Sequence, residues 1–322
     1  MNLREDNNSK FFESEILFFK ICEGEYATFG LREGVKIYRI NPLESIWNGR
    51  IGEIRLVEFL SIKKILIAFV GTGKEPTLSP RKIILYNPKI PTKTELSFDN
   101  TILSMEHNKT RFIVNCFEKI HIYEIPDFEL IGTIPKGVQG NPILALSETN
   151  SNYLAFPKEK TVEIYDLNQF EKLYSIKCHK NPISYLTFSL ENNYLATCSK
   201  IGTLVRIFDL DNKPQKVWKE YRRGTRNAKI YNISFLVNDE FMLITSNHET
   251  IHVVNLKNGK SFGKLNLEAK IPRICGFDQT NKNQFFLISP EPKLLIYQID
   301  TENKKLVFVK ACKIDSNQEE QN

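Results

Sequence analysis

Two adjacent arginines, Arg222 and Arg223, are the residues of this chain best suited to binding chemistry. They lie between two segments with the composition of strands, residues 214–221 and 230–235. Consecutive side chains in extended backbone point to opposite faces. Each guanidinium presents a planar fork of donors that matches phosphate or carboxylate oxygens. The pair could therefore serve two separate anion sites, although a basic pair in isolation would indicate only a solvated turn.

Polar residues at the turns of two neighbouring segments could complete such sites. Hydroxyls and backbone N–H groups at a glycine turn donate to phosphate oxygens, and a phosphate favours the charged form of a nearby histidine. Each turn alone is ordinary turn chemistry, whereas two similar sets on either side of one arginine pair favour anion binding. The first set is His179, Thr197, Ser199, Lys200, Gly202, Thr203 and Arg206, and the second is Ser246, Asn247, Thr250 and His252.

Residues suited to catalysis or metal binding are sparse. The five histidines and the carboxylates are scattered over the chain, and Gly71-Thr72-Gly73-Lys74 is followed by Glu75-Pro76. A phosphate loop needs Ser or Thr after the lysine and a helix after that. No two of the six cysteines form a C-x-x-C pair, which predicts reduced, buried cysteines. We therefore expect no enzymatic activity, no cofactor and no metal.

Charge and hydropathy limit the partners. The 322 residues carry a formal net charge of +6, which suits a polyanionic partner but is small for a dedicated nucleic-acid binder. No apolar core of a signal peptide occurs in residues 1–8, and the longest apolar run, residues 65–70, is far below the roughly 20 residues of a spanning helix. We expect a cytoplasmic protein whose contact with membranes is peripheral.

Seven segments of the chain share one form, in which an apolar strand and a short polar turn precede a second strand with an aromatic or apolar residue near its end. The spacing of these residues, 37 to 48, brackets the period of a four-stranded propeller blade. A polar residue follows each of these aromatic or apolar residues, as in a degenerate WD dipeptide. The seven residues are Tyr38, Tyr86, Tyr123, Tyr165, Phe208, Val254 and Tyr297.

Strand-forming residues also precede and follow each segment, as at residues 183–188 and 217–221 of the fifth. The sequence therefore predicts an all-β, WD40-like, seven-bladed β-propeller over residues 13–313. Residues 1–12 are predicted to be a flexible N-terminus and residues 314–322 a disordered tail. We expect a monomer.

The stretch from Tyr221-Arg222-Arg223-Gly224 to Phe235 resembles the F/L-R-R-G signature of the PROPPINs, the phosphoinositide-binding WD-repeat propellers of autophagy. Residues 70–81, VGTGKEPTLSPR, resemble the V-G-x-G-x-x-P-x-x-S-P-R stretch of the family's second blade. Residues 196–199, 202–206 and 250–252 also fall in register. The resemblance covers almost the whole chain and is greatest to the short, compact branch. Tyr221 stands where the family has Phe or Leu, a packing position where we expect little effect.

The resemblance implies two headgroup pockets for phosphatidylinositol 3-phosphate and phosphatidylinositol 3,5-bisphosphate. It implies a peripheral-membrane effector of autophagosome formation or endolysosomal traffic, with autophagy lipid-transfer or conjugation proteins as partners. The implied membranes are pre-autophagosomal, endosomal or vacuolar. The first pocket would use His179, Thr197, Ser199, Gly202, Thr203, Arg206 and Arg222, and the second Arg223, Ser246, Thr250 and His252.

One departure from the family lies in the sixth repeat. Family members carry a long loop with membrane-inserting apolar residues before the strand that resembles residues 261–265, whereas here the loop is nearly absent. Lys257, Lys260 and Lys264 remain as membrane-facing basic residues, and each would contribute roughly 1 kcal/mol of salt-sensitive attraction. We expect weaker and more salt-dependent membrane binding than in relatives that have the loop.

Two alternatives remain open. A WD-type scaffold that binds only proteins would use the same residues as ordinary turns, and it would tolerate loss of the arginine pair. A nucleic-acid binder is disfavoured because no basic-aromatic surface repeat is visible. For protein partners, residues 74–82 and 99–115 on the second and third repeats are the predicted surface.

Overall fold

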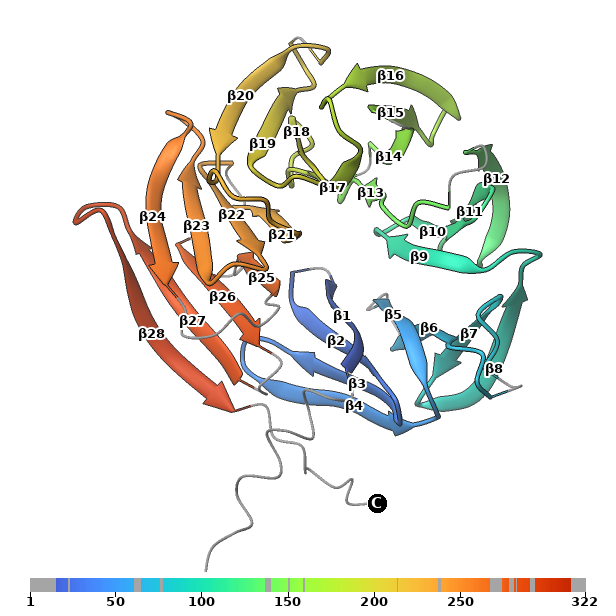
Figure 1. Cartoon of the computed structure of the whole chain (residues 1–322). Coiled ribbons are helices and arrows are strands. Elements are labelled where there is room, and N and C mark those ends of the chain that lie inside the picture. Colours follow the sequence, from blue (N-terminus) through green and yellow to red (C-terminus); the bar gives the residue numbers. More distant parts are fainter. Residues whose placement is uncertain are drawn as a thin grey trace, which may run out of the picture.

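The computed structural model describes residues 16–313 apart from 23, 61–64, 76–77, 137–139, 150, 159, 213, 237–238, 267–273, 278–280, 282 and 290–292. Within these residues the chain forms 28 strands arranged as a closed ring (Figure 1). The predicted flexible N-terminus and the predicted disordered tail lie outside the described residues.

The strands form seven antiparallel sheets, each built from four strands that are consecutive in the chain. In chain order they are β1 Ile16–Cys22, β2 Tyr26–Leu31, β3 Gly34–Arg39, β4 Glu44–Arg50; β5 Ile54–Leu60, β6 Leu66–Gly71, β7 Lys82–Asn87, β8 Ile90–Ser97; β9 Ile102–His107, β10 Arg111–Cys116, β11 Lys119–Glu124, β12 Glu129–Pro135; β13 Ala145–Leu146, β14 Tyr153–Lys158, β15 Thr161–Asp166, β16 Glu171–Lys177; β17 Ile183–Phe188, β18 Tyr194–Ser199, β19 Leu204–Asp209, β20 Val217–Arg222; β21 Ile230–Phe235, β22 Phe241–Ser246, β23 Thr250–Asn255, β24 Lys260–Asn266; β25 Ile274–Phe277, β26 Gln284–Ser289, β27 Lys293–Asp300, β28 Lys305–Lys313.

We number the sheets as blades 1 to 7 in this order. The residue used to align each repeat lies in the third strand of its blade, as Tyr123 does in β11 and Phe208 in β19. The predicted seven-bladed β-propeller is therefore confirmed. Among the described residues, blade 1 consists of the first four strands and blade 7 of the last four, so the two ends of this part of the chain share no sheet.

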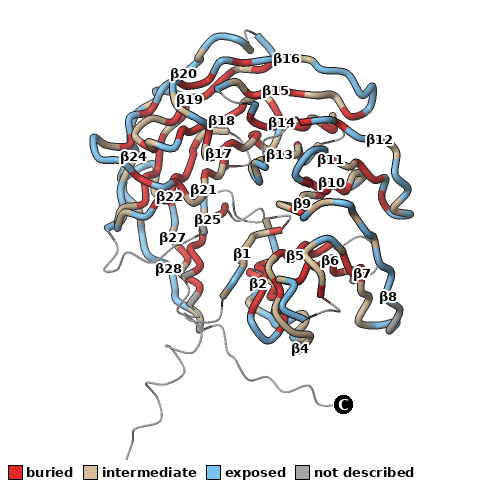
Figure 2. The backbone as a smooth tube through the Cα atoms, turned by 45° about the vertical axis from the view of Figure 1, so that its right-hand side comes forward, coloured by how far each residue is buried: buried red, intermediate tan, exposed pale blue. Residues whose placement is uncertain are grey.

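Apolar side chains between neighbouring blades form the core. Phe29 and Tyr38 of blade 1 pack with Phe286 and Ile296 of blade 7, and this apolar packing helps to close the ring. The two middle strands of the blades are mostly buried, the inner strands are partly buried, and the outer strands are largely exposed (Figure 2). Because burial of apolar surface is the main stabilising term, each blade depends on both neighbours.

A buried charged cluster adds a polar contact near the centre of the ring. Lys20 Nζ of β1 lies 2.9 Å from both carboxylate oxygens of Glu58 on β5 and 2.6 Å from Glu106 Oε2 on β9. His107 Nδ1 lies 2.6 Å from Glu58 Oε1. Burial disfavours ionisation of Glu58, but Lys20 and then His107 override it, so the pKa of Glu58 is lowered. The cluster ties blade 1 to blades 2 and 3.

All six cysteines are free, as predicted. Five of them are buried, also as predicted, and Cys312 is half-buried. Within the described residues, no helix combines the length and apolar character needed to cross a bilayer. The segment that resembled a phosphate loop joins two strands, β6 and β7, instead of opening a helix. A Cβ on Gly71 would lie 2.2 Å from the Leu78 carbonyl oxygen, so close chain approach explains this glycine.

Candidate functional site

Two connections on blade 5 are held against each other and place the arginine pair. The β18–β19 turn and the β20–β21 connection are joined by hydrogen bonds from Arg223 N to Thr203 O and from Ala228 N to Ile201 O, each 2.9 Å. Gly202 has φ +69°, and a Cβ there would lie 1.8 Å from the Ala228 carbonyl oxygen. Only glycine fits this contact. The predicted role of Gly202 as a tight-turn residue therefore has a steric basis.

The two arginines lie in different environments. Arg222 ends β20 opposite Leu204, and its exposed side chain has no hydrogen-bond or ion-pair partner within the described part of the chain. Arg223 is only 7% exposed; its Nε donates to Gly202 O at 2.8 Å and its Nη2 to Arg226 O at 2.7 Å. The alternation expected from extended backbone is confirmed, and Arg223 already satisfies two carbonyls.

The first set of predicted site residues gathers on the face of blade 5 next to blade 4. In the strand register Thr197 pairs with Arg206, and Arg206 pairs with Glu220. Arg206 Nε lies 2.7 Å from Glu220 Oε2, and its Nη1 donates to Cys178 O at 2.7 Å. Glu220, which was not among the predicted site residues, is a carboxylate that neutralises part of this basic face.

His179 joins the same face. Its Nε2 lies 3.2 Å from Thr197 O and 3.1 Å from Thr197 Oγ1. Ser199 ends β18 and Thr203 directly precedes β19, so both hydroxyls lie at the turn that carries Gly202. The structure thus brings the seven residues predicted for the first pocket into one region around the β18–β19 turn.

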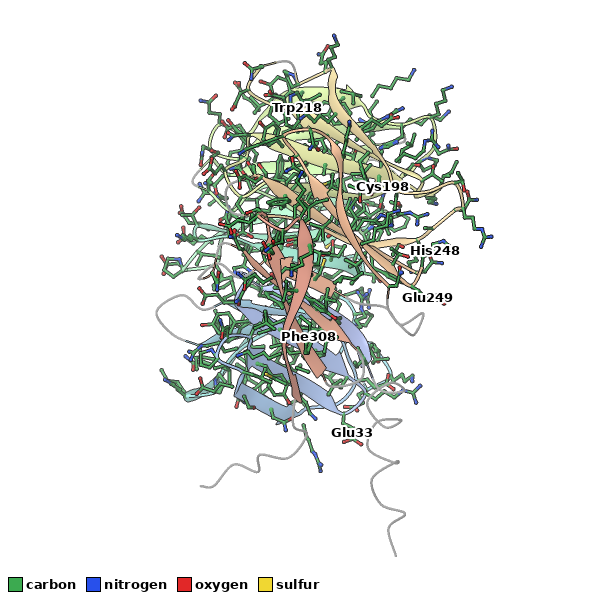
Figure 3. The ribbon with its side chains drawn as sticks, turned by 90° about the vertical axis from the view of Figure 1, so that its left-hand side faces the viewer. Glu33, Cys198, Trp218, His248, Glu249 and Phe308 are labelled. Atoms are coloured by element: carbon green, nitrogen blue, oxygen red, sulfur yellow. The ribbon has the colours of Figure 1, made fainter. Side chains whose placement is uncertain are left out.

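The second set lies on blade 6 around the β22–β23 turn. Ser246 ends β22, Thr250 begins β23, and His252 follows on β23 opposite Lys264 of β24. Figure 3 labels His248 and Glu249 at this turn, and His248 Nε2 lies 2.9 Å from the carbonyl oxygen of Asn227 in the β20–β21 connection. The second set is therefore close to the side of blade 5 that carries Arg223.

Tyr221 connects the two blades. Its hydroxyl lies 3.0 Å from His252 Nδ1, and its ring meets the imidazole edge to face. Phe and Leu lack this hydroxyl, which bonds a predicted site residue, and the expectation of little effect at this position stays a prediction. The sequence carries no signal for this bond, which joins residues 31 positions apart.

Both site histidines are neutral near pH 7 in the absence of an anion. Burial lowers the pKa of His179 to about 4, with Arg206 adding to the effect and the Thr197 carbonyl opposing it. Burial also lowers the pKa of His252 to about 4, helped by Lys264 and Arg223. A bound phosphate would act against both effects, so proton uptake is expected on binding.

The membrane-facing lysines predicted from sequence flank a tight turn. Only residues 256–259 separate β23 from β24, so the expected absence of a long loop is confirmed. Lys260 and Lys264 are exposed, whereas Lys257 pairs with Glu240. Lys219 of β20 donates to the carbonyls of Leu256 and Lys257, which fixes the turn against blade 5.

Comparison with known proteins agrees with this architecture. The PROPPIN family model matches residues 22–262. Autophagy-related protein 18 of Yarrowia lipolytica is 31% identical over 72% of this chain and 64% of its own length. The proteins of the same name from Dictyostelium discoideum and Scheffersomyces stipitis are 32% and 30% identical, over 78% and 70% of this chain. This chain spans 69% and 48% of their lengths.

Solved structures show the same fold. KlAtg21 in complex with the coiled-coil of AgAtg16 has a TM-score of 0.82 at 20% identity, over 94% of this chain and 100% of that one. KlHsv2 with loop 6CD replaced by a Gly-Ser linker has a TM-score of 0.77 at 18% identity, over 94% and 99%. Because the family model matches more than half of the chain, this chain belongs to the PROPPIN family.

Proposed function

We propose that this chain is a non-enzymatic, phosphoinositide-binding propeller that acts as a peripheral-membrane effector and scaffold in autophagosome formation or endolysosomal traffic. The ligands are phosphatidylinositol 3-phosphate and phosphatidylinositol 3,5-bisphosphate, and the protein is cytoplasmic and monomeric. The observation that carries the proposal is the division of Arg222 and Arg223 between two sets of hydroxyl and imidazole groups on blades 5 and 6.

In the first pocket, Arg222 supplies the free guanidinium. Its donors have no partner within the described residues, so a phosphate can accept from two of them without breaking a protein contact. Arg206 is held by Glu220 and by Cys178 O, and a phosphate would compete with Glu220 for it. The hydroxyls of Ser199 and Thr203 complete the donor set.

In the second pocket, Arg223 contributes mainly charge and position. Its Nε and Nη2 donate to carbonyls, so Nη1 is the guanidinium nitrogen left for an anion. Ser246, Thr250 and His252 provide the other donors. We expect this pocket to bind more weakly than the first.

A protein partner completes the proposal. The KlAtg21 structure contains a coiled-coil, and the relatives named above are autophagy-related proteins. We propose lipid-transfer or conjugation proteins of autophagy as the partner class and the blade 2–3 side as their surface. Arg81 and Lys109 are exposed there, whereas Lys74 pairs with Glu53 at 2.7 Å.

Flotation with liposomes of defined headgroup tests the proposal. Binding to vesicles with either inositide, and not to vesicles of the same total charge made with phosphatidylserine, is the expected result. Binding that depends only on charge would contradict specific pockets and leave the protein-scaffold alternative.

A further inference from the structure

An exposed tryptophan on blade 5 faces the short turn of blade 6. Strand β20 has a bulge where it pairs with β19. Val217 pairs with Phe208 and Lys219 pairs with Ile207, so Trp218 is the extra residue of the bulge. A bulge re-aims side chains, and here Trp218 and Lys219 both project toward blade 6. Figure 3 labels Trp218 at the rim of blade 5.

The indole is held firmly although it is exposed. Its ring stacks on Tyr194 with centroids 4.5 Å apart and an interplanar angle of 15°. Lys219 Nζ lies 4.3 Å from the Trp218 ring centroid. Even so, 37% of Trp218 is exposed. An aromatic side chain fixed in this way loses little conformational entropy when it enters a new environment.

The same lysine places the indole beside the β23–β24 turn. Lys219 Nζ donates to the carbonyls of Leu256 and Lys257, and its side chain lies within 3.4 Å of the Cβ position of Gly259. The turn itself offers no exposed apolar side chain, because Leu256 is buried. Trp218 is therefore the apolar group presented at this part of the rim.

The charges around the indole favour an anionic surface. Lys216 and Lys260 are exposed, and their ammonium groups have no partner among the described residues. Glu240 pairs with Lys257, whereas Asp209 accepts only from backbone and amide groups of its own turn and keeps its negative charge. Asp209 and Asp211 thus keep their charge beside the indole, and Lys216, Lys219 and Lys260 outnumber them.

We propose that Trp218 enters the headgroup region of an anionic bilayer and anchors the rim of blades 5 and 6 there. Tryptophan prefers the membrane–water interface, and lysines beside it attract anionic lipids. Arg222 lies four residues after Trp218 in β20, which is roughly 13 Å at the rise of a strand. One membrane surface can therefore contact both Trp218 and Arg222. This inference rests on the proposed function and adds the residue that holds the protein after a headgroup is bound.

The two tryptophans of the chain allow a direct test. Trp47→Phe leaves Trp218 as the single emitter, and Trp218→Phe leaves Trp47 of blade 1. Each variant is mixed with vesicles of phosphatidylinositol 3-phosphate and brominated phosphatidylcholine, and fluorescence and flotation are read on the same samples. Trp218 emission is expected to shift to the blue and to be quenched, while Trp47 emission is unchanged.

Affinity provides the second readout. Trp218→Ala is expected to raise the dissociation constant for vesicles about tenfold. This is the change expected when burial of roughly half an aromatic side chain is lost. Leu130→Ala is the matched control, because Leu130 is an exposed apolar residue on the outer strand of blade 3. Its affinity should equal that of the wild type.

The outcomes separate the two proposals. Flotation without quenching of Trp218, or an unchanged affinity of a folded Trp218→Ala variant, overturns the anchor and leaves phosphoinositide binding intact. Capture of a protein through Trp218 with no quenching by lipid would make this surface a protein contact and also overturns the anchor. Failure of the wild type to float overturns both.

Discussion

Arg222 and Arg223 are neighbours in the chain, yet one guanidinium is exposed and the other is buried and bonded to the carbonyls of Gly202 and Arg226. The pair is thus not two equivalent phosphate ligands. Arg222 is available to a ligand, whereas Arg223 also holds the β18–β19 turn against the β20–β21 connection.

Substitution of the two arginines should therefore have different effects on stability. Arg223→Thr leaves two carbonyls without their charged donor, and we expect a loss of about 1–3 kcal/mol in the free energy of unfolding. Arg222→Thr should change it by less than about 0.5 kcal/mol, as for an exposed residue. Urea unfolding measures both, and equal losses would show that Arg223 does not hold the turns.

Acidification should destabilise the protein through His179 and His252. Their folded pKa values are about 4, whereas an unfolded histidine titrates near 6.5. The unfolded state then binds more protons, so this stability is present above pH 6.5 and is lost as the pH falls toward 4. At pH 5 we expect a loss of about 1–2 kcal/mol per histidine.

The control for this prediction is the His179→Gln, His252→Gln double variant. Asp239, whose pKa burial raises to about 6, contributes in the opposite direction over part of the same range. The difference between wild type and variant isolates the histidines. Parallel curves of unfolding free energy against pH for the two proteins would exclude the assignment.

Tyr221→Phe should weaken the second pocket without unfolding the protein. The Tyr221 hydroxyl, 3.0 Å from His252 Nδ1, is expected to donate to that nitrogen, so the ring proton is on Nε2. Without the hydroxyl, His252 loses the bond that orients its ring toward the anion. Titration of a soluble inositol bisphosphate headgroup into Arg222→Thr, with and without Tyr221→Phe, measures the effect. A several-fold loss is expected, and equal affinities would show that the hydroxyl only fills space.

Disrupting the charged cluster near the centre of the ring should destabilise the fold strongly. Glu58→Gln removes the carboxylate between Lys20 and His107, and breaking a buried pair typically costs about 3–5 kcal/mol. The matched control is Glu95→Gln, since Glu95 pairs with Lys82 on the surface at 2.8 Å and should change stability by less than about 1 kcal/mol. Similar thermal midpoints for both variants would contradict a role in joining blades 1, 2 and 3.

The sequence was sufficient to predict the blades and not their contacts. Aromatic residues such as Tyr123 and Phe208 recur at blade spacing, and alternation within each strand is local, so the fold could be predicted. The seven-residue set around Gly202 was predicted from its turn chemistry beside the arginine pair and from motif resemblance. Contacts between blades could not be predicted, because they join residues far apart in the sequence. Lys20 and Glu106 are 86 positions apart, and Tyr221 and His252 are 31 positions apart.

Two local features were also missed for physical reasons. The bulge at Trp218 shifts the alternation of β20, and nothing in the residues 217–219 marks it. The ion pair between Arg206 and Glu220 arises from cross-strand register, which strand periodicity alone does not fix. Both features bear on the proposed membrane binding.

The measurement that tests the central claim most directly is flotation of wild type, Arg222→Thr and Arg226→Thr on vesicles containing phosphatidylinositol 3-phosphate. Arg226 is an exposed arginine in the same connection, so its loss removes the same charge. Phosphatidylinositol 4-phosphate vesicles supply the same lipid charge. We predict that Arg222→Thr loses most of the preference for the 3-phosphate and that Arg226→Thr keeps it. Equal binding by the two folded variants would contradict an Arg222-centred headgroup pocket.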